Sequence, residues 1–111
     1  MNEQAVIVHF EYAADGVEDL FEIEERLEDA IEAAGVGEFD GNEIALDLSD
    51  GSLYMYGPDA EALFAVARPI LEGAACFGEM RVVLQFGPPE TDTPERVETL
   101  RGRGEAPSIR G

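Results

Sequence analysis

Three patterns in the 111-residue sequence predict an α+β fold. Short segments rich in β-branched and aromatic residues alternate with longer segments in which apolar residues recur every three or four positions. The pair Asp50-Gly51 separates two alternating polar–apolar segments, which is typical of a β-hairpin. With right-handed crossovers, the resulting β-α-β-β-α-β order predicts a ferredoxin-like sandwich, a four-stranded antiparallel sheet with both helices on one face.

The first two segments are expected to form one strand and one long helix. Residues Gln4–Tyr12, QAVIVHFEY, have the composition of a strand. Asp15 can cap a helix from Val17 to Ala34, with Glu18 three residues after the cap, and Gly35 is placed to end it. Apolar residues at helical spacing predict that one face of this helix packs on the sheet. These residues are Leu20, Ile23, Leu27, Ala30, Ile31 and Ala34.

The middle of the chain is expected to form the hairpin. Its strands are predicted at Ile44–Ser49 and Ser52–Tyr56, on either side of the Asp-Gly turn. A two-residue loop would place two apolar pairs on the core face and two further pairs on the opposite, open face. The core pairs are Leu48 with Leu53 and Leu46 with Met55; the open-face pairs are Asp47 with Tyr54 and Ala45 with Tyr56.

A second helix and a fourth strand are expected to complete a single domain over residues 1–89. Asp59 follows Gly57-Pro58 and is placed to start the helix. Pro69 falls inside the helical pattern and is expected to kink or split the helix near Arg68. Met80–Phe86 has the composition of a strand. In the tail, residues 90–111, the run Thr93-Pro94-Glu95 predicts a short helix to about Leu100, followed by a loosely held end.

The charge of the chain is strongly negative and unevenly distributed. The sequence has 25 acidic residues and 7 arginines, with no lysine, for a net charge of −18. Residues 1–87 carry 20 of the acids and 3 of the arginines, whereas the tail has a net charge of −1. Binding to nucleic acids and anionic lipids depends largely on Lys and Arg, so neither kind of partner is expected.

The first helix concentrates this charge, with eight acids and the single cation Arg26. One interpretation is a solvated helix face, suited to solubility or to a salty cytoplasm. The other is a docking surface for a basic protein, such as a nuclease or toxin domain. We therefore predict a cytoplasmic, non-catalytic interaction module, of the inhibitor or immunity type. The partner-binding candidates on the helix are Glu18, Glu22, Glu25 and Asp29.

The open face of the predicted sheet offers a second candidate surface. Strand alternation places Ile7, Tyr54, Tyr56 and Val83 there, where they would form an apolar and aromatic patch suited to a homodimer through the sheet face. The alternative is ordinary β-propensity. His9 and Glu11 share the same face with the two tyrosines, a set that could transfer protons. A small enzyme or a ligand-binding dimer with a pocket over this face is therefore the alternative function.

The sequence contains few other candidates for chemistry. Asp40, Asn42 and Glu43 resemble an oxygen-ligand cluster, but their spacing does not fit a calcium loop and Gly41-Asn42 also suits a plain turn. We therefore expect no metal ion and no cofactor. Cys76 is the single cysteine and cannot form an internal disulfide; its apolar neighbours indicate a small core residue.

Two segments resemble a group of small acidic bacterial proteins to which no activity is assigned. They are a D-G-x-E segment and a Y-x-Y-G-P-D-A-x-x-L-F segment continued by P-x-L, within residues 17–89. The resemblance implies no activity, cofactor or partner. Its positions are Asp40, Gly41, Glu43, Tyr54, Tyr56, Gly57, Pro58, Asp59, Ala60, Leu63, Phe64, Pro69 and Leu71. Most of these positions are explained as turn, cap or core residues, and Glu43 is the one without an obvious structural role.

Overall fold

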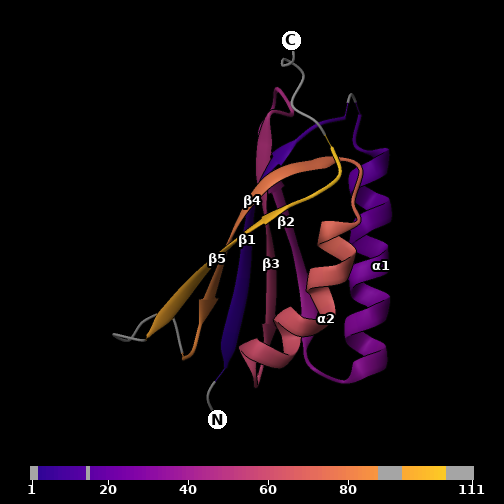
Figure 1. Ribbon diagram of the computed structural model, residues 1–111. Coiled ribbons are helices and arrows are strands. Elements are labelled where there is room, and N and C mark those ends of the chain that lie inside the picture. Colours follow the sequence, from indigo (N-terminus) through magenta and orange to yellow (C-terminus); the bar gives the residue numbers. More distant parts are fainter. Residues whose placement is uncertain (1–2, 15, 88–93, 105–111) are drawn as a thin grey trace.

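The computed structural model describes residues 3–14, 16–87 and 94–104, and it shows an α+β protein with two helices and one antiparallel sheet of five strands (Figure 1). The sheet order is β2-β3-β1-β4-β5. The elements are β1 (Gln4–Tyr12), α1 (Glu18–Ala34), β2 (Glu38–Ile44), β3 (Asp50–Gly57), α2 (Ala60–Glu72), β4 (Phe77–Gln85) and β5 (Glu95–Arg101). Among the described residues, neither helix is long and apolar enough to span a bilayer.

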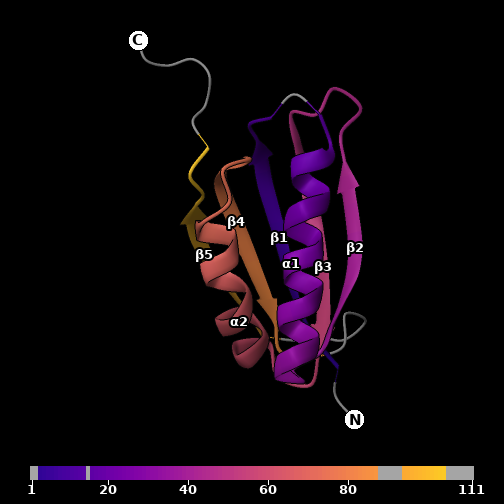
Figure 2. The ribbon, with the colours of Figure 1, turned by 90° about the vertical axis from the view of Figure 1, so that its right-hand side faces the viewer.

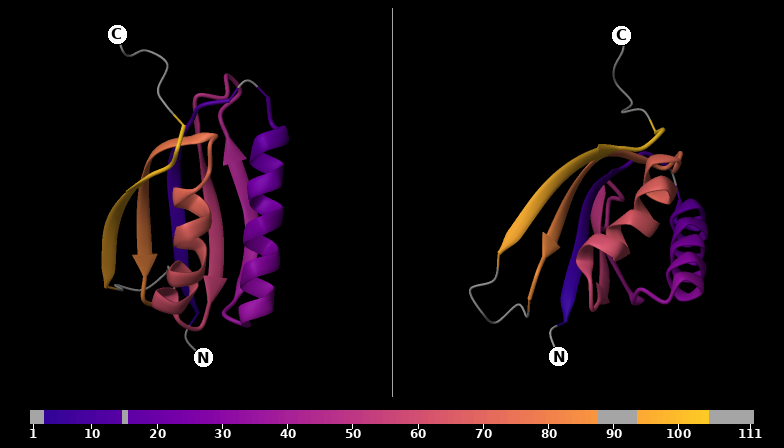
Figure 3. Two further views of the ribbon diagram at one scale, coloured as in Figure 1. Left: turned by 45° about the vertical axis from the view of Figure 1, so that its right-hand side comes forward. Right: turned by 60° about the horizontal axis from the view of Figure 1, so that its bottom comes forward.

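Both helices lie on one face of the sheet, and no other described element covers the opposite face (Figures 2 and 3). The core forms between the helices and the inward side chains of β1, β3 and β4. Because side chains alternate along a strand, each strand contributes every second residue to this core. Val6, Val8, Leu53, Met55 and Leu84 are completely buried in this way.

Helix α1 begins one residue later than predicted, and it buries the predicted face except at Ala34, which is exposed. Leu20, Ile23, Leu27 and Ile31 are buried, and Gly35 ends the helix in the left-handed conformation with φ of 68°. Ala30 and Ala34 are less buried and flank this stripe. Val17 occupies the N-cap position and makes no capping bond through its side chain; the predicted cap, Asp15, lies outside the described residues.

Helix α2 begins as predicted and continues through its proline. The Asp59 side chain accepts hydrogen bonds from the backbone N–H groups of Glu61 and Ala62, which confirms it as the N-cap. The helix runs from Ala60 to Glu72 without a break at Pro69, so the predicted split is wrong. Pro69 is exposed and lies only one turn from the end of the helix. Proline has no backbone N–H, so one intrahelical hydrogen bond is lost there, but the helix ends soon afterwards.

The predicted hairpin is wrong in its position and register. Strand β2 covers Glu38–Ile44, and Asp50 and Gly51 belong to β3 instead of the turn. The connection is the five-residue segment 45–49, in which the Asp47 carboxylate accepts from the Ser49 backbone N–H at 3.0 Å and from its hydroxyl at 2.7 Å. This Asx-type turn connects the two strands in place of the turn predicted at Asp50-Gly51.

The new register changes the neighbours of every residue in the hairpin. Leu53 pairs with Asn42 and Met55 with Phe39, and Leu46 is fully exposed instead of buried. Gly51 lies within the ladder opposite Ile44, where an added Cβ would lie against the Glu43 carbonyl oxygen and 2.8 Å from the ring of Phe10. The close approach of this ring explains why a strand position carries glycine. Ala45 and Asp47, expected on the open face, lie in the loop.

The prediction of four strands is also wrong, because residues Glu95–Arg101 form a fifth strand in place of the predicted short helix. This strand pairs with β4 from Glu79 to Gln85. Its Leu100 is buried opposite Met80. Pairing satisfies the backbone groups along the outer edge of β4, which outweighs the local helix-start signal. The predicted starter Thr93 and the end of the tail, residues 105–111, lie outside the described residues.

Candidate functional site

An apolar row crosses the open face of the sheet. Tyr54 on β3 lies opposite Ile7 on β1, Ile7 lies opposite Val83 on β4, and Val83 lies opposite Val97 on β5. Val83 is only 8% exposed, whereas 51% of Val97 is accessible at the end of the row. The predicted patch residues Ile7, Tyr54 and Val83 are therefore direct neighbours. Tyr56 lies one row away, opposite Ala5.

Val97 was absent from the sequence-based patch because its segment was predicted as a helix. The alternation in Glu95–Arg101, ERVETLR, could have indicated a strand with Val97 and Leu100 on opposite faces. A proline at a favourable helix-start position outweighed that signal.

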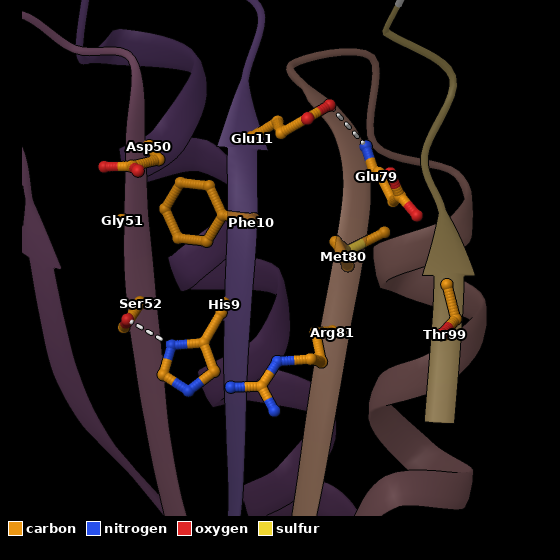
Figure 4. A pocket seen from close by; sticks show the side chains of 10 residues that line it. All are labelled: His9, Phe10, Glu11, Asp50, Gly51, Ser52, Glu79, Met80, Arg81 and Thr99. Carbon is orange, nitrogen blue, oxygen red and sulfur yellow. Dashed lines mark hydrogen bonds between the residues drawn. The ribbon is translucent and has the colours of Figure 1, made fainter. Parts of the chain in front are cut away.

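The second candidate set surrounds His9 in the centre of the sheet (Figure 4). The Nδ1 atom of His9 lies 2.9 Å from Oγ of Ser52 on β3. The Glu11 carboxylate accepts a hydrogen bond of 3.2 Å from the backbone N–H of Glu79. Arg81 lies opposite His9 on β4, and its guanidinium extends beside the imidazole ring. His9 and Glu11 therefore have separate partners.

A shallow pocket of about 440 Å³ lies over these residues, and neither tyrosine lines it. The described residues that line it include three carboxylates, from Glu11, Asp50 and Glu79, and one guanidinium, from Arg81. Tyr54 and Tyr56 line a different depression, of about 370 Å³, next to β2. The predicted His–Glu–Tyr set is thus divided between two shallow sites.

Glu43 has a partner that the sequence did not reveal. The Tyr54 hydroxyl donates a 2.9 Å hydrogen bond to Oε1 of Glu43, and this bond raises the pKa of the tyrosine above its ordinary value. The corrected hairpin register makes the contact possible, because Tyr54 pairs with Gly41, near Glu43 on β2. Glu43 therefore has a structural partner on the open face.

The predicted metal-ligand candidates do not converge. Glu43 accepts from Tyr54, the Asn42 side-chain amide donates to Glu24 on α1, and Asp40 lies at a bulge in β2. Among the described residues, no three carboxylate, histidine or cysteine side chains are grouped so that they could hold a metal ion. Burial raises the pKa of Glu24, which Asn42 partly offsets and Glu28 reinforces.

Helix α1 presents its acids to solvent. Glu18, Glu22, Glu25 and Asp29, the predicted partner-binding residues, are all exposed. The ion pairs among the described residues join Arg68 with Glu72 and Arg96 with Glu61 and Glu98, and none of them involves α1. Among the described residues, only Arg26 on the helix itself offsets this negative charge, and it forms no ion pair with a described acid.

An aromatic residue lies within this acidic surface. Phe21 is 56% exposed and points away from the buried stripe of α1. Its neighbours on the helix surface, three residues before it and three and four residues after it, are Glu18, Glu24 and Glu25. Phe21 was not among the residues predicted from the sequence, although an apolar residue outside the core stripe was a visible signal.

Cys76 lies in the core, as the sequence predicted, and is 3% exposed. Burial raises the pKa of its thiol to about 11, and the nearby acids Asp19 and Glu22 add to this effect. A thiol with this pKa is almost entirely protonated at neutral pH, so it is a poor nucleophile.

The chain matches no family model, no curated protein and no solved structure. The function is therefore argued from the geometry of these surfaces.

Proposed function

We propose that the protein is a non-catalytic interaction module, an inhibitor or immunity-type binder that holds a basic protein against α1. The observation that carries the proposal is the exposed Phe21 surrounded by acids that form no ion pair with any other described residue. An aromatic anchor with a polar or charged surround is the usual composition of a binding hot spot. Full burial of an exposed phenylalanine side chain contributes about 1.5–3 kcal/mol. Phe21 is 56% exposed, so covering the rest of its surface can contribute roughly 0.8–1.7 kcal/mol to binding.

The surrounding acids have a separate role in this proposal. Pairs such as Glu18/Glu22 and Glu25/Asp29 repel each other at one-turn spacing, each at a cost of about 0.2–0.5 kcal/mol at low salt. A basic partner would relieve this repulsion and would be steered to the helix by the field of the acids. The charges then determine the association rate, and Phe21 determines much of the residence time.

Affinity capture followed by direct binding measurement tests the proposal. The protein is immobilised, exposed to lysate of the cells that express it, and the retained proteins are identified and purified. We expect a basic protein whose affinity falls at least about tenfold between about 0.05 and 0.5 M salt. The Phe21→Ala variant is expected to weaken its binding about 4- to 20-fold.

Two triple variants separate the α1 surface from the overall charge. The first neutralises Glu22, Glu25 and Asp29 on α1; the control neutralises Glu3, Glu38 and Glu79, which are exposed outside α1. Both change the net charge equally, but only the first is expected to slow association. Equal effects of the two variants, or unchanged binding by Phe21→Ala, would refute α1 as the binding surface.

The pocket at His9 supports a second candidate, a site for a small ligand. Its volume of about 440 Å³ is within the usual range for ligand sites, and its acids outnumber its single arginine. The chemistry favours a small organic amine. Putrescine is a suitable probe: ring signals of His9 followed by NMR are expected to shift saturably, and less so in the Glu79→Gln variant. Unchanged signals at millimolar putrescine would exclude this candidate.

A further inference from the structure

The two edges of the sheet differ in charge and regularity. Edge strand β2 carries Glu38, Asp40 and Glu43 with no cation, and its pairing with β3 is interrupted by a bulge between Phe39 and Gly41. Charge and bulges on an edge strand prevent it from pairing with another chain. Edge strand β5 has two acids and two arginines, and its register with β4 is uninterrupted. Only the β5 edge is therefore suited to accept another strand.

The direction of the backbone groups on β5 follows from two hydrogen bonds at its ends. The carbonyl of Pro94 accepts from the Phe86 N–H at 3.1 Å, and the Gly102 N–H donates to the Gly78 carbonyl at 2.9 Å. Antiparallel strands alternate, so the even-numbered residues of β5 bond to β4, and Glu95, Val97 and Thr99 direct their backbone groups away from it. No described element lies beyond this edge (Figure 3). Pro94 therefore removes no donor from the free edge.

We propose that β5 pairs antiparallel with β5 of a second copy of this chain, with the two-fold axis at Val97. In this register the two Val97 residues exchange both of their backbone hydrogen bonds, and each Glu95 exchanges bonds with Thr99 of the other copy. These three pairs use only the outward-directed backbone groups of Glu95, Val97 and Thr99, so the bonds between β5 and β4 are kept. The result is a continuous ten-stranded sheet.

Charge complementarity selects this register. Arg96 of one copy lies directly opposite Glu98 of the other, in a non-hydrogen-bonded pair, where cross-strand side chains are closest. In the single chain Nε of Arg96 lies 2.9 Å from Oε2 of Glu98, and its terminal nitrogens bind Glu61 at 2.6 and 2.9 Å. These ion pairs hold the Arg96 side chain beside the β5 edge, on the face of the sheet that carries the helices.

The apolar row gives a second reason for the same axis. Val97 is its exposed end, and pairing of the two Val97 residues joins the rows of Tyr54, Ile7, Val83 and Val97 into one row across both copies. The side chains of a directly opposite pair lie on the same face, so Val97 is covered by its equivalent.

The large negative charge does not prevent this association. Helix α1 contacts α2 and β2, so its acids lie toward the edge opposite to β5. Four strand spacings separate the edges, about 19 Å, whereas the Debye length at physiological salt is about 8 Å. We therefore expect dimerisation to strengthen as salt rises from very low concentration, opposite to the behaviour proposed for the basic partner.

Sedimentation equilibrium of the purified full chain tests the proposal. The wild type is expected to show a concentration-dependent monomer–dimer equilibrium, and hydrogen exchange is expected to protect the Val97 and Thr99 amides at high concentration. The Val97→Pro variant removes one outward donor without affecting any bond to β4. We expect it to raise the dissociation constant at least about tenfold, with an unchanged circular dichroism spectrum.

Charge variants test the same register without placing a proline in β5, so they do not depend on the folding of Val97→Pro. Glu98→Arg places like charges opposite each other and is expected to weaken the dimer, while Arg96→Glu with Glu98→Arg restores opposite charges and the dimer. A chain that stays monomeric at all concentrations overturns the proposal. A dimer that survives Val97→Pro and is lost in Ile7→Glu also overturns it, because that result assigns the contact to the sheet face.

Discussion

Replacement of Gly57 by alanine is expected to destabilise the protein for a steric reason. Gly57 is buried at the end of β3, where an added Cβ would lie 3.0 Å from the Cα of Gly37 and closer still to the Val36 carbonyl oxygen. These are backbone atoms of the α1–β2 connection, so they cannot rotate away as a side chain would. Overpacking costs about 1–3 kcal/mol, and the upper end is expected here. For a domain of this size that is a fall in Tm of roughly 10–20 °C.

Urea denaturation followed by far-UV circular dichroism measures this loss. Gly35→Ala is the matched control, because Gly35 has φ of 68° but nothing within 4 Å of the added Cβ. Alanine at that position has only the cost of the left-handed conformation, about 1–2 kcal/mol. Gly57 has no such φ, so its loss is purely steric. A Gly57→Ala variant no less stable than Gly35→Ala would refute the close-packing argument.

Two further predictions concern titratable groups. The pKa of Glu24 is raised by burial, so its ionisation opposes folding as the pH rises above the ordinary pKa of 4.5. Glu24→Gln should therefore increase the free energy of unfolding at pH 7, by about 0.2–0.5 kcal/mol through loss of repulsion from Glu28. No gain is expected below about pH 4, where the carboxyl group is protonated. Urea titrations at the two pH values check this, and an equal gain at both would contradict it. Cys76, buried and with a thiol pKa of about 11, should resist a disulfide reagent at pH 8 in the folded protein and react within minutes in urea. Rapid labelling of the native protein would contradict this prediction.

The elements with strong local signals were predicted well. Strand β1 has its predicted bounds, α1 differs by one residue at its start, and Asp59 caps α2. In each case the information lies within one or two turns or along one alternating stretch: a capping side chain, a glycine at a helix end, or an apolar period. The exposed acids of α1 follow from the same period, which leaves them no place in the core.

The candidate site was predicted less completely, because its contacts cross between strands. His9 and Glu11 are on the expected face, but their partners, Ser52 and the Glu79 backbone, come from residues 43 and 68 positions away. Tyr54 meets Glu43 only in the observed hairpin register. A shift of one residue reverses which side chains face the core, so an error in the turn carries through the whole hairpin.

By itself, the sequence determined the α+β class, both helices, the first strand and the concentration of charge on α1, because these depend on neighbouring residues. The tertiary structure decided the hairpin register and whether residues 95–101 form a helix or a strand. Two local signals of comparable strength conflict there: Pro94, just before the segment, favours the start of a helix, and the alternation within the segment favours a strand. The unpaired edge of β4 resolves the conflict by offering backbone partners along its length, and such partners exist only once the sheet has formed.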